Sequence, residues 1–292
     1  MAITLEDIKN LRERTGAGMA DCKKALEEAN GDMEGAIDIL RKKGAATAAK
    51  RADKAADEGM IATAVADDHK SAAVVEINCE TDFVARNAEF STFAEKIANV
   101  VLQNNPASEA ELLSAEIDGI TVEAGLNELL AKFSERIGIR RFERIETNDG
   151  FISDYIHGGS RLAVLVELGS AGDDNDKSDR LARDIAMQVA AMNPAHVSRD
   201  EFTPEVIEKE REIYREQLAG ENKPADIIEK IVNGRVEKFF EESTLLEQSF
   251  VKDSSKRIAD VMKEHSEGAT VRRFIRFNLG ESLEEATSTE EA

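Results

Sequence analysis

The chain has 292 residues, of which 41% are hydrophobic and 33% charged, with only 4 prolines. These values are typical of a folded globular protein of two or three compact units, and they exclude a disordered or collagen-like chain. The formal charge of −21 argues against direct binding of nucleic acid through a basic surface. The first 54 residues hold 11 basic and 10 acidic residues, so the net negative charge belongs to the rest of the chain.

Cysteine content and the N-terminal sequence bear on the cellular location. Cys22 and Cys79 are too few for a disulfide framework, which is typical of a reducing compartment. The opening residues MAITLEDIKN lack a basic region followed by an apolar one, and the apolar runs are no longer than strands. We therefore expect a cytoplasmic protein with neither a secretory signal nor a membrane partner.

Residues 1–44 carry the start and stop signals of three short helices. Thr4 is a candidate N-cap of the first helix, and Gly16 follows its apolar stripe. Asp32 is a candidate cap of the third helix, which we expect to end at Gly44. Helices this short are stable only when they pack together, so the pattern predicts a three-helix bundle.

An internal repeat follows this bundle. Each copy has the pattern of two strands joined by a turn and followed by an amphipathic helix, which predicts two related α+β subdomains. The offset between the copies is 91 residues through the strands and 88 after them. The matched segments are Gly59–Ile61 with Gly150–Ile152, Val74–Ile77 with Leu165–Leu168, and Asn105–Ala107 with Asn193–Ala195.

Further elements lie between and after the copies. Thr121 is a candidate cap of a helix that we expect to end at Gly138, before the alternating strand IRRFERIE. Pro204 begins a pattern of two helices broken at GENKP, which predicts an antiparallel helical hairpin. A strand is predicted from Thr270, and the acidic tail from Glu281 is expected to be disordered.

Together these patterns predict an α+β protein with a three-helix bundle, two repeated subdomains and an inserted helical hairpin. Residues 45–57 contain no large apolar side chain, so they are expected to form a helical or mobile linker. The expected boundaries are bundle 1–44, linker 45–57, first subdomain 58–146, second subdomain 147–200 and 247–280, hairpin 201–246 and acidic tail 281–292.

The motifs of common enzyme classes are missing from the sequence. The dipeptide Gly-Lys of a phosphate-binding loop does not occur, and neither does a GxSxG or GxGxxG motif. The four histidines show no metal-binding spacing. We therefore expect no catalytic residue, no metal site and no cofactor.

One segment is unusual on physical grounds. Residues 79–87, CETDFVARN, lie between a strand of buried type and a helix. Phe83 can be a core residue and Asp82 a helix cap, which is the simpler interpretation. The second copy, however, has Ser-Ala-Gly-Asp-Asp there. Because the repeated fold does not require an aromatic residue at this turn, Phe83 can instead protrude toward a partner.

Three motifs in this order resemble the bacterial elongation factor Ts family, the guanine-nucleotide exchange factors of elongation factor Tu. They are LRERTGAGMADCKKALEEANGD at Leu11–Asp32, NCETDFVARN at Asn78–Asn87 and IHGGSRLAVLVEL at Ile156–Leu168. The resemblance covers nearly the whole chain. It implies a bundle like ubiquitin-associated domains, and a non-enzymatic translation factor that binds elongation factor Tu and promotes GDP release.

The resemblance also implies site residues. One segment would disturb the magnesium and phosphate site of the partner GTPase, and other residues would make further partner contacts. The first group is Thr81, Asp82, Phe83 and Val84, and the second is Arg12, Met19, Lys23 and His157. Each of the residues in the second group also has an alternative interpretation. Met19 can belong to the bundle core, and Arg12 and Lys23 can be solvated surface charges. His157 can cap its own hairpin.

Two other functions compete with nucleotide exchange. An adaptor could dock partners through the bundle and the helical hairpin, and an acid–base enzyme could use Asp82 and His157 if they shared a cleft. The chain departs from some family members at its end, GESLEEATSTEEA, which lacks an apolar helical module. The hairpin is a candidate contact in a homodimer, but its sequence does not decide the oligomeric state.

Overall fold

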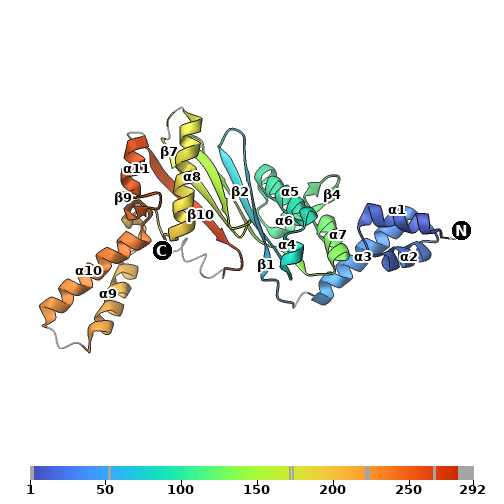
Figure 1. The fold of residues 1–292 in the computed structure, drawn as a ribbon, viewed down its shortest axis with the longest axis horizontal. Coiled ribbons are helices and arrows are strands. Elements are labelled where there is room, and N and C mark those ends of the chain that lie inside the picture. The colour runs from blue at the N-terminus through green and yellow to red at the C-terminus, as the bar shows by residue number, and fades with distance from the viewer. Residues whose placement is uncertain are drawn as a thin grey trace. The chain divides into compact units, whose positions relative to one another are not determined.

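The computed structural model describes residues 3–51, 54–170, 172, 174–220, 224–265 and 268–281. Helices and strands are both present, so the α+β class is confirmed. The chain divides into two compact units. Figure 1 shows the ribbon coloured along the sequence. Unit 1 consists of Met1–Ala64, Ala73–Ile145 and Gly158–Arg161, and unit 2 of Val65–Ala72, Glu146–His157 and Leu162–Ala292. The expected disordered tail lies, from residue 282, outside the described residues.

Three helices at the start of unit 1 pack around a small apolar core. They are α1 (Leu5–Thr15), α2 (Met19–Glu28) and α3 (Met33–Arg51). Leu11, Cys22 and Leu26 are fully buried among them. Thr4 and Asp7 form a reciprocal capping box at α1, as the sequence indicated. The three helices thus stabilise one another through tertiary contacts.

The expected end of the third helix at Gly44 is wrong. Helix α3 continues to Arg51 through an alanine-rich segment of high helix propensity. Gly44 is buried, and a Cβ atom at this position would lie 2.3 Å from the carbonyl oxygen of Asn127. The glycine therefore allows α3 to approach a neighbouring helix closely, and it does not act as a stop signal.

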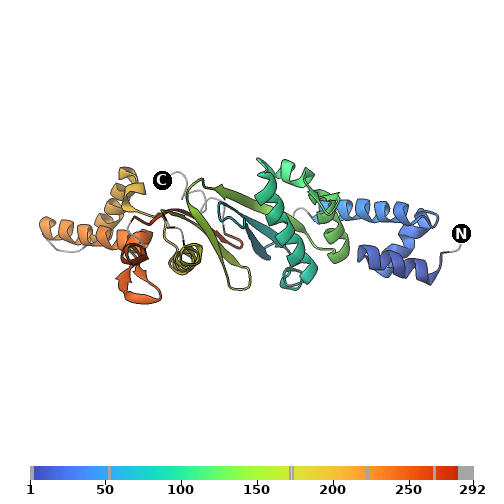
Figure 2. The ribbon, with the colours of Figure 1, turned by 90° about the horizontal axis from the view of Figure 1, so that it is seen from above.

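The rest of unit 1 is a three-stranded sheet with helices packed against it. The strand order is β1 (Glu58–Val65), β2 (Ser71–Cys79) and β5 (Ile137–Glu146). Helices α5 (Ala88–Asn104) and α7 (Val122–Phe133) share one apolar core with these strands. Figure 2 shows the same ribbon from above. The smaller elements are α4 (Asp82–Ala85), α6 (Glu109–Ser114), β3 (Glu116–Ile117) and β4 (Ile120–Thr121).

Helix α7 begins as expected but ends earlier. The hydroxyl of Thr121 accepts a hydrogen bond from the backbone N–H of Ala124, so the predicted cap is confirmed. The helix ends at Phe133, before the expected Gly138, because Ser134 adopts a left-handed conformation at φ +55°. Gly138 lies inside β5.

Unit 2 contains a second three-stranded sheet. Strand β7 (Leu162–Gly169) is central and pairs antiparallel with β6 (Phe151–His157) and β10 (Thr270–Asn278). Helix α8 (Asn175–Met192) runs along this sheet in Figure 1 and buries Leu181, Ile185 and Val189. The sequence did not indicate β8 (Ser249–Phe250), β9 (Asp253–Arg257) or α11 (Ile258–His265).

A pair of helices, α9 (Pro204–Leu218) and α10 (Ala225–Ser243), lies between α8 and these late elements. Thr203 caps α9 and Pro204 occupies its first turn, as expected. The pair has its own apolar cluster, in which Leu218 and Val232 are buried. Ile213 on α9 is 37% exposed.

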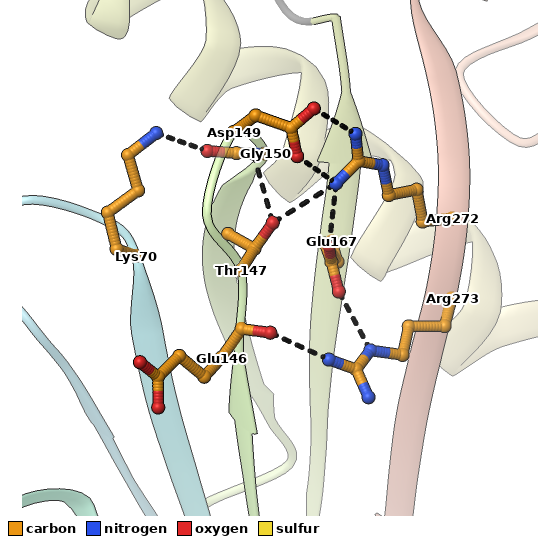
Figure 3. Close-up of polar contacts among 8 residues, drawn as sticks. All are labelled: Lys70, Glu146, Thr147, Asp149, Gly150, Glu167, Arg272 and Arg273. Atoms are coloured by element: carbon orange, nitrogen blue, oxygen red, sulfur yellow. Dashed lines mark hydrogen bonds and ion pairs between the residues drawn. The ribbon is translucent and has the colours of Figure 1, made fainter.

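A buried carboxylate organises the sheet of unit 2. Glu167 on the central strand accepts hydrogen bonds from Arg273 Nε at 2.7 Å and Arg272 Nη1 at 3.3 Å (Figure 3). Arg272 also binds Asp149, and its Nη1 donates to Thr147 Oγ1. Burial acts to raise the pKa of Glu167, but hydrogen bonds involving Thr147 and Arg273 outweigh it and lower the pKa.

The sheet of unit 1 has the same arrangement. Glu76 on central strand β2 is fully buried, with Arg141 Nε at 2.7 Å and Arg140 Nη1 at 3.6 Å from its carboxylate oxygens. Each sheet thus joins its central strand to its third strand through one glutamate and two consecutive arginines. Because an unpaired buried carboxylate is costly, a strand shift that separated the glutamate from its arginines would be disfavoured.

The helix ends also match between the copies. Asn105 and Asn193 are the C-caps of α5 and α8, with left-handed φ angles of 46° and 45°. Asparagine tolerates this conformation, and the proline that follows each one prevents the helix from continuing.

Within the described residues, every helix is too short or too polar to cross a membrane.

Two glycines within helices, one at a close contact and one facing open space, allow a matched test. Gly44→Ala should lower the free energy of unfolding by about 1–3 kcal/mol, because the new methyl group overpacks the contact with Asn127. Gly234→Ala in α10 should raise it by about 0.5–1 kcal/mol, because that position faces open space. Urea unfolding of both variants measures the difference, and stabilisation by both would contradict the close contact of α3.

Candidate functional site

The segment singled out in the sequence forms a separate short helix. Strand β2 ends at Cys79, and α4 begins at Asp82 with Thr81 as its N-cap. The side chain of Val84 is 6% exposed and packs into the core of unit 1, whereas Phe83 beside it is 83% exposed. The interpretation of Phe83 as a core residue is therefore wrong. The turn thus exposes the ring of Phe83 to solvent, while Val84 anchors the same helix in the core.

A glutamate from a distant part of the chain holds the first residue of this turn. Glu135 accepts hydrogen bonds from the backbone N–H of Thr81 at 3.0 Å and from its hydroxyl at 2.7 Å. The same hydroxyl faces the backbone N–H of Val84 at 3.5 Å, and the Cys79 thiol donates to the Thr81 carbonyl oxygen. Thr81 is thus bound through its backbone and its side chain.

The residue before it is also anchored. Glu80 accepts two hydrogen bonds of 2.6 Å from the guanidinium of Arg51, the last residue of α3. It accepts a third from the backbone N–H of Arg136. The hydrogen bond from Arg51 is the main cause that lowers the pKa of Glu80 to about 2. Glu80 therefore carries its charge throughout the neutral and mildly acidic range.

Asp82 lies on the exposed side of the turn. Its carboxylate is 3.1 Å from Arg86 Nη2, one helical turn further along. The alternative that Asp82 caps a helix is wrong, because Thr81 caps α4 and Asn87 caps α5.

The three candidate residues of the bundle differ in exposure. Arg12 in the last turn of α1 is exposed, and so is Lys23 in α2, which lies 3.7 Å from Glu27. Met19, the first residue of α2, is half-buried against the bundle core. Part of Met19 therefore packs inside and part remains available to a partner.

His157 is exposed at the end of β6 in unit 2. Its Nδ1 lies 2.9 Å from the hydroxyl of Tyr155. The two glycines that follow, Gly158 and Gly159, both have positive φ angles and form the tight turn toward β7.

The residue before Glu80 is a buried cysteine. Burial raises the pKa of the Cys79 thiol to about 12, so this cysteine is not a nucleophile at neutral pH. No group of three or more histidine, cysteine, aspartate or glutamate side chains among the described residues is arranged to hold a metal ion. The distinctive feature is a supported, solvent-exposed aromatic residue.

Comparison with known proteins agrees with the motifs. The family model described as elongation factor TS matches residues 80–281, which is more than half of the chain. The chain belongs to the elongation factor Ts family. It is 47% identical to elongation factor Ts of Clostridium perfringens over 287 residues, which span 97% of this chain and 94% of that protein. It is also 47% identical to elongation factor Ts of Aquifex aeolicus over 288 residues, 96% of this chain and 99% of that protein. The resemblance found in the sequence is thereby confirmed, and the chain is a translation elongation factor.

Sequence reasoning missed the residues that support the turn. Glu135 and Arg136 lie between α7 and β5, more than 50 residues after Glu80 and Thr81. Arg51 falls in the segment expected to be a linker. In a chain with 59 acidic residues, a single glutamate at this distance gives no local signal.

Adjacent residues of the turn should differ in their effect on stability. Phe83→Ala should change the free energy of unfolding by less than about 0.5 kcal/mol, because the ring is in solvent. Val84→Ala should lower it by about 1.5–3 kcal/mol, because it removes buried methyl groups. Urea unfolding provides the measurement, and a large loss of stability in the Phe83 variant would mean that the ring packs inside.

The lowered pKa of Glu80 predicts a pH dependence. Its folded pKa of about 2 lies below the ordinary value of 4.5, so its contribution to stability is present above pH 4.5 and is lost as the pH falls toward 2. In an NMR titration, the carboxyl carbon of Glu80 should not respond between about pH 5 and pH 3, where ordinary glutamates titrate. Arg51→Met should move the midpoint up toward the ordinary value, and an unchanged midpoint would show that Arg51 is not the cause.

Proposed function

We propose that this chain is a guanine-nucleotide exchange factor that binds elongation factor Tu in its GDP state and promotes GDP release. The observation that carries the proposal is the exposed ring of Phe83 beside the buried Val84. A monomer gains nothing in stability from a phenylalanine that is 83% exposed, whereas a partner that buries the ring gains free energy.

The mechanism requires no covalent step by this chain. A GTPase of this type holds its nucleotide through backbone N–H groups around the phosphates and through Mg²⁺. Phe83 would enter between elements of the partner, with Thr81, Asp82 and Val84 in the same segment, and would disturb that site. The carboxylate of Asp82 beside it would disfavour nearby phosphate by like-charge repulsion. GDP would then leave and GTP could bind.

Burial of one ring supplies only part of the free energy. A phenylalanine side chain contributes about 1.5–3 kcal/mol on burial, which is the order of a typical coupling between two binding sites. Further contacts would come from Arg12, Met19 and Lys23 on a bundle that resembles ubiquitin-associated domains, and from His157 in unit 2. The exposure of Arg12, Lys23 and His157 supports this assignment.

The wider organisation belongs to the same proposal. The bundle, the two repeated subdomains and the inserted hairpin would act as separate domains of a cytoplasmic factor that binds no nucleic acid directly. The hairpin formed by α9 and α10 is a candidate contact in a homodimer.

Release of a fluorescent GDP analogue from elongation factor Tu of the same organism, at fixed Mg²⁺, tests the function. The chain should accelerate release at substoichiometric amounts, and Phe83→Ala should slow the accelerated rate by about 10–100-fold, the equivalent of losing one buried phenylalanine. Val251→Ala removes another exposed apolar side chain, in unit 2, and should have no effect.

Other outcomes would point elsewhere. Binding without acceleration would favour the adaptor function, in which the bundle and the hairpin dock partners. Because binding linkage is reciprocal, GDP must also weaken the complex by the same factor as the complex weakens GDP binding. A complex indifferent to GDP would rule out nucleotide exchange.

A further inference from the structure

The supports of the α4 turn form a reciprocal arrangement. The carboxylate of Glu135 accepts the backbone N–H of Thr81, and the carboxylate of Glu80 accepts the backbone N–H of Arg136. Each segment thus supplies one carboxylate acceptor and one backbone N–H donor, and each pair consists of two consecutive residues. We call these four residues, Glu80, Thr81, Glu135 and Arg136, the clasp.

The clasp joins two segments of unit 1, and Arg51 links them to a third. Glu80 and Thr81 precede α4, and Glu135 and Arg136 precede β5. Arg51, at the end of α3, binds Glu80 through two nitrogens, and its pKa is raised by Glu80 and also by the charge of Glu135. The guanidinium of Arg51 therefore offsets the charge of both carboxylates. Arg136 adds a hydrogen bond to the carbonyl oxygen of Lys54, beyond the end of α3.

The turn after the central strand differs between the two copies. In unit 2, β7 ends at Gly169 and α8 begins at Asn175, with no short helix among the described residues between them. That sheet nevertheless keeps the buried glutamate, the two arginines and the asparagine helix cap of unit 1. Among the described residues, a short helix after the central strand is therefore present in the first copy and not in the second.

A helix of four residues has too few hydrogen bonds to be stable alone. Val84 fixes one side of α4 in the core, but the N-terminal end depends on Thr81. Because Phe83 makes no comparable anchoring contact of its own, the direction in which its ring points follows from the orientation of this short helix. A contact that fixes Thr81 therefore restricts Phe83 before a partner binds. Less conformational entropy is then lost when the partner buries the ring.

We propose that Glu135 is a positioning residue for nucleotide exchange, which holds Thr81 and thereby keeps α4 and Phe83 ready to enter the partner. The inference rests on the function proposed above. Glu135 itself need not touch the partner. Its loss should reduce the maximal rate of GDP release more than it changes the concentration needed for half-maximal rate, because contacts outside the turn remain intact.

The test compares four variants in the GDP-release assay. Glu135→Ala should lower the maximal rate by about tenfold, the order expected for hydrogen bonds to a charged group. Glu135→Gln keeps an oxygen for the Thr81 N–H and an amide group beside the hydroxyl, so it should recover most of the rate. Glu264→Ala, which removes an exposed glutamate bound to Lys256 in unit 2, is the matched control and should behave like the unaltered protein. Phe83→Ala supplies the reference for loss of the ring.

A double variant separates positioning from general loss of structure. If Glu135 acts through Phe83, the variant with both Phe83→Ala and Glu135→Ala should release GDP no more slowly than Phe83→Ala alone. Hydrogen exchange gives a second readout. In Glu135→Ala the amides of Thr81 and Val84 should exchange about tenfold faster, while those in the middle of α5 should be unchanged.

The outcomes distinguish the two proposals. If Phe83→Ala slows release but Glu135→Ala does not, the positioning role is wrong and the exchange function stands. The positioning role would also be overturned if the double variant released GDP more slowly than Phe83→Ala by the full factor seen for Glu135→Ala. Faster amide hydrogen exchange throughout unit 1 would overturn it as well. If Phe83→Ala leaves release unchanged, the proposed function fails, and this inference fails with it.

Discussion

A four-residue helix cannot maintain its shape in water, because nucleating it costs more free energy than its few hydrogen bonds recover. Helix α4 therefore depends on its surroundings: the core receives Val84, Glu135 binds Thr81, and Arg51 binds Glu80. These contacts come from the sheet, from the loop before β5 and from the last residue of α3. The position of one exposed phenylalanine is thus determined by residues from several separate segments of unit 1.

The two sheets show which parts of the repeated design are structural. Both retain a glutamate in the central strand, two arginines in the third strand and an asparagine at the end of the covering helix. Buried ion pairs contribute little net stability, but a buried carboxylate left without its partner is costly, so these pairs disfavour a shifted register within each sheet. The turn after the central strand differs between the copies, and there the first copy has an exposed aromatic residue. The exposed aromatic residue thus lies at a turn in which the two copies differ.

Sequence reasoning succeeded where a signal was local. Thr4, Thr121 and Thr203 cap their helices as expected, because a cap is recognised within a few residues. It failed at Gly44 and Gly138, since glycine can end a helix, allow close packing or lie within a strand, and only the tertiary neighbours decide which. The exposure of Phe83 was indicated by comparison of the two copies. The role of Glu135 was not, because its partner is 54 residues away. The partner contacts and domain boundaries inferred from the sequence stay predictions.

The duplicated ion pairs also bear on how the chain reaches its fold. Strands β5 and β10 carry the same tripeptide, Arg-Arg-Phe, so the unfolded chain contains two similar third strands for two similar central strands. During synthesis from the N-terminus, β5 emerges before β7 and β10, and β2 can pair with it while no competitor exists. Refolding of the full-length chain offers both choices at once. Vectorial synthesis therefore removes an ambiguity in strand pairing that the repeated sequence creates.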